Sequence, residues 1–236
     1  MPHGERLVAL RGVSKDYHGL RPLRIGHLDL HAGQSIALIG FDQVTAQVLV
    51  DLITGATTPE AGEVVVFGRP TAAIPDEQAW FALLDAFGLL SERAVLVEQF
   101  TAEQNLILPF TLDLEDVPDS VRAAVRQLGD EIGLSSRELG LPMAALTPSA
   151  RLRIRLGRAL ALRPRVLLAE HPNASLPGDD TAPFAADLAR IIADRGLAAL
   201  VMTADRTFAN AVSEEVLSLQ PATGELKRSS GWRRWF

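Results

Sequence analysis

One stretch near the N-terminus, SIALIGFDQVTAQVLVDLIT at residues 35–54, constrains the fold more than any other. An apolar run ends at Gly40, a short polar turn follows, and apolar residues recur at helical spacing from about Ala46. A strand, a glycine, a turn and a helix in this order form the layout of a phosphate-binding loop, in which amides at the helix N-terminus face an anion. The stretch therefore predicts a strand–loop–helix unit of the kind that binds phosphate.

The residues of this loop differ from those that usually bind phosphate. The phosphate-binding motif reads GxxxxGK[ST], whereas the window here reads GFDQVTAQ, with Thr45, Ala46 and Gln47 at the Gly, Lys and Ser/Thr positions. The candidate nucleotide-contacting residues of the loop are Gly40, Phe41, Asp42, Gln43, Val44, Thr45, Ala46 and Gln47. The stretch has the layout of a phosphate-binding loop without its lysine and its hydroxyl.

The rest of the chain alternates between strand and helix patterns. Strands are expected over residues 7–10, 23–30, 36–39, 63–67, 166–169, 198–202 and 216–220, the last of these closing the fold. Helices are expected over residues 46–54, 118–134, 148–162, 181–195 and 204–212, and residues 76–110 are interpreted as helix, loop and helix around FGLL at residues 87–90. This α/β alternation predicts a mostly parallel sheet covered by helices on both faces.

Composition and charge argue against several classes of function. With 29 acidic and 23 basic residues the net charge is −6, whereas nucleic-acid-binding proteins need a clustered basic field. The chain has no cysteine, which suits the cytosol, and its five histidines show no HxxH or HExxH spacing, so no disulfide framework and no zinc site is expected. No apolar run is long enough to span a membrane. We expect a soluble protein, or one that is held at a membrane by a partner.

Four later segments resemble, in order and spacing, those of the ATP-binding cassette (ABC) ATPases. LITGATTPEAGEVVVFGRP at residues 52–70 is similar to the segment after the family's phosphate loop. LGRALALRPRVLLAEHPNASL at residues 156–176 is similar to its signature helix, Walker B strand and D-loop. FGLLSERAV and QNLILPFTL, within residues 87–112, resemble the Q-loop region, and TADRTFANAV at residues 203–212 resembles the switch segment. With the opening loop, the resemblance extends from residue 7 to residue 226.

The resemblance implies a P-loop NTPase fold of the ABC cassette type, with a mostly parallel core sheet, an N-terminal antiparallel β element and a helical subdomain. It implies a single nucleotide-binding domain over residues 1–226, with a core lobe at about 1–85 and 160–226 and a helical lobe at about 86–159. Residues 227–236 are interpreted as an aromatic and basic tail that ends in GWRRWF. Such a tail suits a membrane interface or a partner groove, and a frayed terminus is the alternative.

The sequence departs from the family pattern at the residues that carry chemistry. Ala46 replaces the lysine that reaches the β- and γ-phosphates, and Gln47 replaces the hydroxyl that ligates Mg²⁺. At roughly 1.5–3 kcal/mol for each hydrogen bond to a charged group, these losses weaken nucleotide binding by about 10²–10⁴-fold. The resemblance therefore implies ATP and Mg²⁺ as cofactors, with binding that is weak or absent.

The Q-loop and signature positions are altered as well. Asp85 is placed at the Q-loop glutamine, and LTPSA at residues 146–150 replaces the signature LSGGQ, with Thr147 and Ser149 as its candidate contacts. In this family two cassettes dimerise head to tail, and each site combines the phosphate loop of one with the signature of the other. In a heterodimer with an intact cassette, this chain would therefore weaken both sites.

Three further positions have both a chemical and a structural interpretation. Glu170 replaces the aspartate linked to Mg²⁺ and is the candidate metal ligand, although a carboxylate at a strand end is also common; no other metal site is expected. His171 replaces the general base, and Glu170 and His171 are the candidate catalytic residues. A structural hydrogen bond or an exposed position is the alternative for His171. Tyr17 lies at about the position of the aromatic residue that stacks on adenine, and a surface tyrosine is the alternative.

The resemblance implies the cassette subunit of an ABC-type membrane transporter in which ATP hydrolysis is impaired or absent. The expected partners are a membrane permease subunit and another ABC cassette, in a homo- or heterodimer. No nucleic acid is expected, and membrane contact is expected through a partner. The expected location is the cytoplasm, peripheral on the cytoplasmic face of the membrane. Two alternatives stay open: an ATPase-inactive soluble scaffold or regulator, and an active ATPase that uses unorthodox residues.

Overall fold

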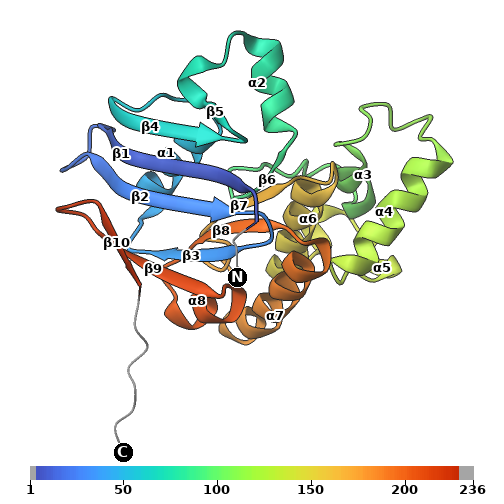
Figure 1. Ribbon diagram of the computed structural model, residues 1–236. Coiled ribbons are helices and arrows are strands. Elements are labelled where there is room, and N and C mark those ends of the chain that lie inside the picture. Colours follow the sequence, from blue (N-terminus) through green and yellow to red (C-terminus); the bar gives the residue numbers. More distant parts are fainter. Residues whose placement is uncertain (1–3, 229–236) are drawn as a thin grey trace, which may run out of the picture.

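The computed structural model describes residues 4–228, so the interpretation of the GWRRWF tail falls outside the described residues. Within that part the chain forms a four-stranded sheet and a six-stranded sheet, with helices around them (Figure 1). This α/β architecture confirms the fold class expected from the sequence. No helix in the described part is long and apolar enough to cross a lipid bilayer.

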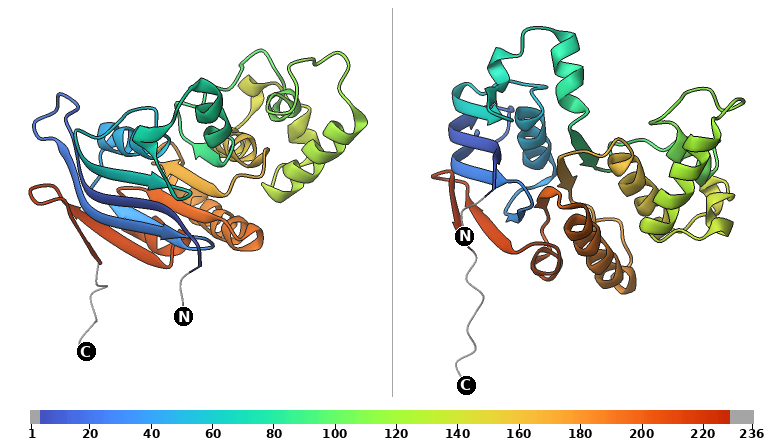
Figure 2. Two further views of the ribbon diagram at one scale, coloured as in Figure 1. Left: turned by 45° about the horizontal axis from the view of Figure 1, so that its top comes forward. Right: turned by 45° about the vertical axis from the view of Figure 1, so that its right-hand side comes forward.

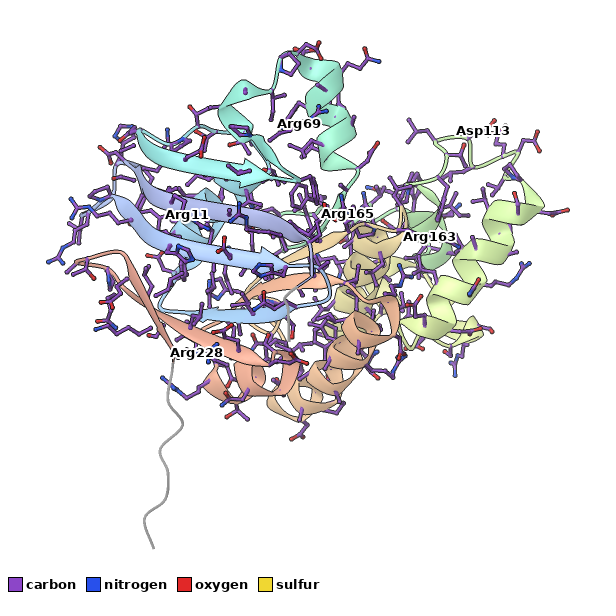
Figure 3. The ribbon with its side chains drawn as sticks, viewed as in Figure 1. Arg11, Arg69, Asp113, Arg163, Arg165 and Arg228 are labelled. Carbon is purple, nitrogen blue, oxygen red and sulfur yellow. The ribbon has the colours of Figure 1, made fainter. Side chains whose placement is uncertain are left out.

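The four-stranded sheet is antiparallel throughout, in the order β2-β1-β4-β5. Its strands are β1 (Arg6–Lys15), β2 (Leu23–His31), β4 (Ala61–Val66) and β5 (Arg69–Pro70). Ion pairs join neighbouring strands: Arg11 of β1, labelled in Figure 3, donates to both carboxylate oxygens of Asp29 of β2 at 2.6 and 2.8 Å. This sheet is the N-terminal antiparallel β element.

The six-stranded core sheet has the order β10-β9-β3-β8-β7-β6, and every pair except β10–β9 is parallel. Its strands are β3 (Ser35–Ile39), β6 (Phe87–Leu90), β7 (Val166–Glu170), β8 (Ala198–Met202), β9 (Glu215–Gln220) and β10 (Glu225–Arg228). The mostly parallel core sheet expected from the sequence is therefore confirmed. The last strand was not predicted: the sequence was expected to close with the strand at residues 216–220, and β10 follows it.

The expectation that FGLL forms a loop is wrong. These residues form β6 and pair in parallel with β7. Four apolar residues are too few for periodicity to separate a strand from a loop. Gly88 is needed within this strand, since a Cβ atom there would lie 2.5 Å from the carbonyl oxygen of Ala159. The strand is therefore specified by close packing against α6 (Pro148–Leu160).

The remaining helices are short to medium in length. They are α1 (Gln43–Ile53), α2 (Glu77–Leu84), α3 (Ala102–Ile107), α4 (Asp119–Glu131), α5 (Ser136–Leu139), α7 (Gly178–Arg195) and α8 (Arg206–Val212), with 3₁₀ turns at Thr71–Ala73 and Met143–Ala145. Helices α3, α4 and α5 lie to one side of the two sheets (Figure 2). The start of α6 is as predicted, with Thr147 as N-cap and Pro148 in the first turn.

The core sheet is buried on both faces. Alternate strand residues point to opposite sides: Leu168 and Leu200 belong to the cluster with α1 and the antiparallel sheet. Leu167 and Val201 belong to the cluster with α6, α7 and α8. Because both faces are covered, the ends of the parallel strands are the part of this sheet left to form a site.

Candidate functional site

The candidate site lies where the parallel strands of the core sheet end. Strands β3, β8, β7 and β6 are adjacent and parallel, so their carboxyl ends meet at one edge, where α/β proteins bind their ligands. The segments that leave this edge begin at Gly40, Ser91, His171 and Thr203. Four segments far apart in the sequence therefore meet at this carboxyl edge.

The N-terminus of α1 is capped by a carboxylate of its own chain. Asp42 Oδ1 accepts hydrogen bonds from the Thr45 amide at 2.8 Å and from the Thr45 hydroxyl at 2.7 Å. The Asp42 amide donates to Thr45 Oγ1 at 2.9 Å, which completes a capping box. The bond from the Thr45 amide, followed by that from its hydroxyl, holds the pKa of Asp42 below its usual value. A negative charge of the protein itself therefore sits at the positive end of this helix.

The capping box moves the start of α1 toward the N-terminus. The helix begins at Gln43 rather than near Ala46, so the start expected from the sequence is wrong. Residues 43–45 are consequently helical, although the expected layout assigns them to a loop. The side chain of Ala46 is fully buried in the core beside Leu49. A long charged side chain at position 46 would therefore have to enter the core.

At the end of β7, Glu170 is bonded to an arginine from another segment. Its Oε2 accepts from Arg93 Nε at 3.1 Å and from Ser91 Oγ at 2.9 Å, and its Oε1 accepts from Arg93 Nη2. The Glu170 side chain is only 6% exposed, so these charge-assisted bonds compensate a carboxylate that has lost most of its water. Both oxygens of the candidate metal ligand are engaged within the protein.

Asp51 of α1 is a second carboxylate beside the same guanidinium. Its Oδ1 lies 3.7 Å from Arg93 Nη1. Burial raises the pKa of Asp51, with the attraction of Arg93 acting against this and the charge of Glu170 adding to it. The hydrogen bond to Glu170 raises the pKa of Arg93 in turn. One guanidinium thus lies between two carboxylates from α1 and β7.

His171 follows Glu170 in a left-handed backbone conformation, with φ +44°. Its amide donates to the Met202 carbonyl at 2.8 Å, and its Nε2 is buried without a hydrogen-bond partner in the described structure. A cavity of about 240 Å³ adjoins it, lined by Gln43, Ser91, Glu92, Glu170, His171 and Ala174. The cavity brings the start of α1, the end of β7 and the segment after β6 together.

The segment after β8 is joined to the segment after β7 by side chains. Thr203 Oγ1 donates to Asn173 Oδ1 at 2.9 Å, and Asn173 Nδ2 lies 3.4 Å from Asp205 Oδ2. Asp205 also caps α8 by accepting from the Phe208 amide at 3.1 Å. These bonds hold two of the four segments at the edge in fixed positions.

The sequence matches the model of a known protein family. The sequence model of the ABC transporter family matches residues 23–174, which is more than half of the chain. The chain belongs to the ABC transporter family.

Relatives in this family match along almost the whole length of the chain. The lipoprotein-releasing system ATP-binding protein LolD 2 of Caulobacter vibrioides is 29% identical over 227 residues, covering 94% of this chain and 98% of that protein. The methionine import ATP-binding protein MetN of Corynebacterium efficiens is 26% identical over 223 residues, covering 92% of this chain and 61% of that protein.

Solved structures of ABC cassettes share the fold. The cbiO1 protein of Clostridium perfringens, described as part of the ABC transporter complex cbiONQ, has a TM-score of 0.80 at 16% identity and covers 94% of this chain and 87% of its own. A bacterial ABC transporter cassette solved as a dimer has a TM-score of 0.78 at 20% identity and covers 96% of this chain and 100% of its own. The likeness to these ABC cassettes concerns the fold alone.

Of the residues expected to act in an ABC site, the carboxyl edge brings together Gln43, Glu170 and His171. The expected position of Asp85 at this edge is corrected by the structure. Asp85 caps the C-terminus of α2, before β6 begins at Phe87. Since β6 runs parallel to β7, this position lies at the amino edge of the sheet, opposite Glu170. The Q-loop assignment of Asp85 fails because β6 was interpreted as a loop.

Three other expected contacts lie outside this edge. Thr147 and Ser149 are at the start of α6, where the Thr147 hydroxyl accepts from the Ala150 amide at 3.2 Å. Tyr17 lies between β1 and β2, half-buried against the cluster that contains α1. In the described structure none of the three has a hydrogen bond to Glu170 or His171, and their roles stay predictions.

The sequence interpretation missed Ser91, Arg93 and Asp51. A signal existed, because a carboxylate such as Glu170 at the end of a fully apolar strand needs a partner. Had FGLL been interpreted as a strand, the residues directly after it would have been placed at the same edge. Only the parallel pairing of β6 with β7 makes Arg93 the partner.

Proposed function

We propose that this chain is the cassette subunit of an ABC-type membrane transporter and that its own nucleotide centre does not support normal ATP turnover. The observation that carries the proposal is the carboxylate of Asp42 at the N-terminus of α1, bonded to the Thr45 amide. This is the helix end at which a phosphate-binding loop would hold a phosphate. Because the names of the relatives include both lipoprotein release and methionine import, we propose the subunit and no particular cargo.

The geometry argues against a tightly bound triphosphate. A phosphate brought to the start of α1 would meet the charge of Asp42 and compete with it for the Thr45 amide. The lysine that would offset this repulsion is replaced by a fully buried Ala46. Like charges at close range in a partly desolvated site cost on the order of 1–4 kcal/mol. We therefore propose that ATP binding at this chain's own loop is weak or absent.

The residues at the carboxyl edge do not fit Mg²⁺. Both oxygens of Glu170 are bonded to Arg93 and Ser91, and Gln47 stands at the position of the hydroxyl ligand. In residues 4–228 no group of three or more His, Asp or Glu side chains is placed to hold a metal ion. Hydrolysis that depends on a bound metal is not expected here, and the roles of Glu170 and His171 in catalysis stay predictions.

The family also suggests an assembly. We propose that the chain pairs with a second ABC cassette, in a homo- or heterodimer, and docks on a membrane permease subunit from the cytoplasmic side. The core lobe would comprise residues at about 1–85 and 160–226, together with β6, and the helical lobe the remainder of about 86–159. Relatives that cover almost the whole chain and a cassette solved as a dimer support this assembly.

Nucleotide binding and phosphate release from the purified chain test the proposal. We expect no saturable binding of a fluorescent ATP analogue up to about 1 mM and phosphate release at the level of the buffer. Glu170→Ala and His171→Ala should then release phosphate at the same background level as the wild type. Turnover by the wild type that either substitution abolishes would overturn the proposal and favour an unorthodox ATPase.

Membrane association tests the second half of the proposal. Co-expression with an ABC permease subunit from the same genome should bring the chain into the membrane fraction, and omission of the permease should leave it in the soluble fraction. A matched chain without residues 231–236 separates docking through the folded domain from docking through the tail. Failure to reach the membrane with any ABC permease subunit of that genome would favour a soluble scaffold instead.

A further inference from the structure

The carboxyl edge holds a positive charge that belongs to the chain itself. We propose that the Arg93 guanidinium is a built-in cation that takes the place of a divalent metal ion between Glu170 and Asp51, so that the folded chain needs no metal at this edge. The inference concerns the fold of the isolated chain and is independent of its role in a transporter. It follows from the two carboxylates, the burial of one of them and the way Arg93 is held.

Glu170 is a buried carboxylate. Its side chain is 6% exposed and lies at the end of a strand whose residues are all buried. An ionised carboxylate in such a place is strongly destabilising unless a cation and hydrogen-bond donors accompany it. Arg93 supplies a two-pronged contact through Nε and Nη2, and Ser91 supplies a hydroxyl donor.

A second carboxylate lies on the far side of the guanidinium. Asp51 approaches Arg93 Nη1 at 3.7 Å, so one cation serves two acids from α1 and β7. Carboxylates are typical ligands of hard divalent ions in proteins, and Mg²⁺ is usually bound by one or two of them together with waters. Here the planar guanidinium, which is always charged, occupies that position.

Arg93 is fixed in place by its own backbone and by the residues that follow it. Its amide donates to Ser91 Oγ at 3.2 Å, which closes the turn after β6. The next residues are tied to α6, since Arg158 Nη1 donates to the Val95 carbonyl at 2.7 Å and Arg155 Nε to the Ala94 carbonyl at 3.4 Å. The cation is therefore held at the edge by both β6 and α6.

Thermal unfolding of the full chain without nucleotide, with and without MgCl₂, tests the proposal. The melting temperature of the wild type should not respond to about 10 mM MgCl₂. Arg93→Met should lower it by roughly 5–10 °C, because a buried carboxylate loses its partner. With Mg²⁺ in about tenfold excess over its dissociation constant, this variant should regain roughly 3–6 °C, and NaCl of equal ionic strength should restore none of it.

Arg195→Met is the matched control. Arg195 makes a similar two-pronged contact with Glu131, at 2.6 and 2.5 Å. That pair is only half-buried, and among the described ion pairs Arg195 has no second carboxylate partner. Loss of Arg195 should lower the melting temperature without any response to Mg²⁺. The double variant Arg93→Met with Asp51→Asn should not recover with Mg²⁺ either, because one of the two carboxylates is then missing.

Two results would overturn the proposal. One is a wild type that Mg²⁺ stabilises as much as it stabilises Arg93→Met; the other is an Arg93→Met variant that does not respond to Mg²⁺. If Arg93→Met does not fold, Arg93→Met combined with Glu170→Gln decides the matter. The double variant should fold, because no uncompensated charge is buried, and its failure to fold would show that Arg93 acts by packing instead.

Discussion

The carboxylate of Asp42 accepts hydrogen bonds from both the amide and the hydroxyl of Thr45, at 2.8 and 2.7 Å. The capping box of these two residues starts α1, so this helix carries its own anion. At the other side of the same edge, Arg93 brings a cation to Glu170. The two charges that a magnesium–nucleotide complex would bring to this edge are both supplied by the protein.

The cap formed by Asp42 should contribute to stability in a pH-dependent way. Asp42→Ala should lower the free energy of unfolding near neutral pH by about 1 kcal/mol, as loss of an N-cap does. Because the pKa of Asp42 is lowered by folding, its ionic contribution is complete above the ordinary value of 3.8 and is lost as the pH falls below it. Urea unfolding at several pH values measures this.

Asp42→Asn is the control for the ionic part of the cap, since asparagine also caps helices but does not titrate. The stability difference between the wild type and Asp42→Asn should shrink toward zero as the pH falls below 3.8. A difference that is constant over this range would contradict the lowered pKa. The comparison isolates Asp42 from all other carboxyl groups.

Restoring the family's lysine should damage the fold and should not recover ATP binding. Ala46 is fully buried, so Ala46→Lys should cost about 1–3 kcal/mol from overpacking alone, to which desolvation of the ammonium adds. Val44→Lys is the matched control in the same turn, because Val44 is 53% exposed, and it should change stability by less than about 0.5 kcal/mol. A stable Ala46→Lys variant that binds ATP would refute this account of the loop.

Arg158 should hold the segment after β6 against α6. Its guanidinium donates to the Val95 carbonyl at 2.7 Å. Because this bond is exposed to solvent, Arg158→Met should cost only about 0.5–1.5 kcal/mol, and it should speed amide hydrogen exchange in residues 93–97. The exposed Arg126 of α4 is the control, and Arg126→Met should leave that exchange unchanged. Equal exchange in both variants would contradict the role of Arg158.

Gly88 should be required for the close packing of β6 against α6. A Cβ atom at this position would lie 2.5 Å from the Ala159 carbonyl oxygen, so Gly88→Ala should cost about 1–3 kcal/mol. Gly178 at the start of α7 has nothing within 4 Å of a Cβ, and Gly178→Ala should be neutral or stabilise by up to about 1 kcal/mol. Chemical denaturation of the two variants decides between them, and equal effects would contradict the packing argument.

Local sequence patterns were enough to predict most of the fold. The apolar runs that became β7 and β8 were placed nearly to the residue, and Thr147 with Pro148 marked the start of α6. The edge strand β6 was missed, because four apolar residues without a clear period do not separate a strand from a loop. Because β6 was not predicted, the expected Q-loop contact was assigned to Asp85, which lies at the opposite edge of the sheet.

The sequence by itself determined the fold class and showed that position 46 lacks the motif lysine and position 47 the motif hydroxyl, since periodicity, caps and motif residues act over a few positions along the chain. Only the tertiary structure decided which charged groups meet at the carboxyl edge of the sheet. Arg93 and Glu170 are 77 residues apart and meet because β6 pairs with β7, and a pairing of strands across the sheet leaves no local pattern in either segment. Long-range pairing therefore placed the cation at this edge.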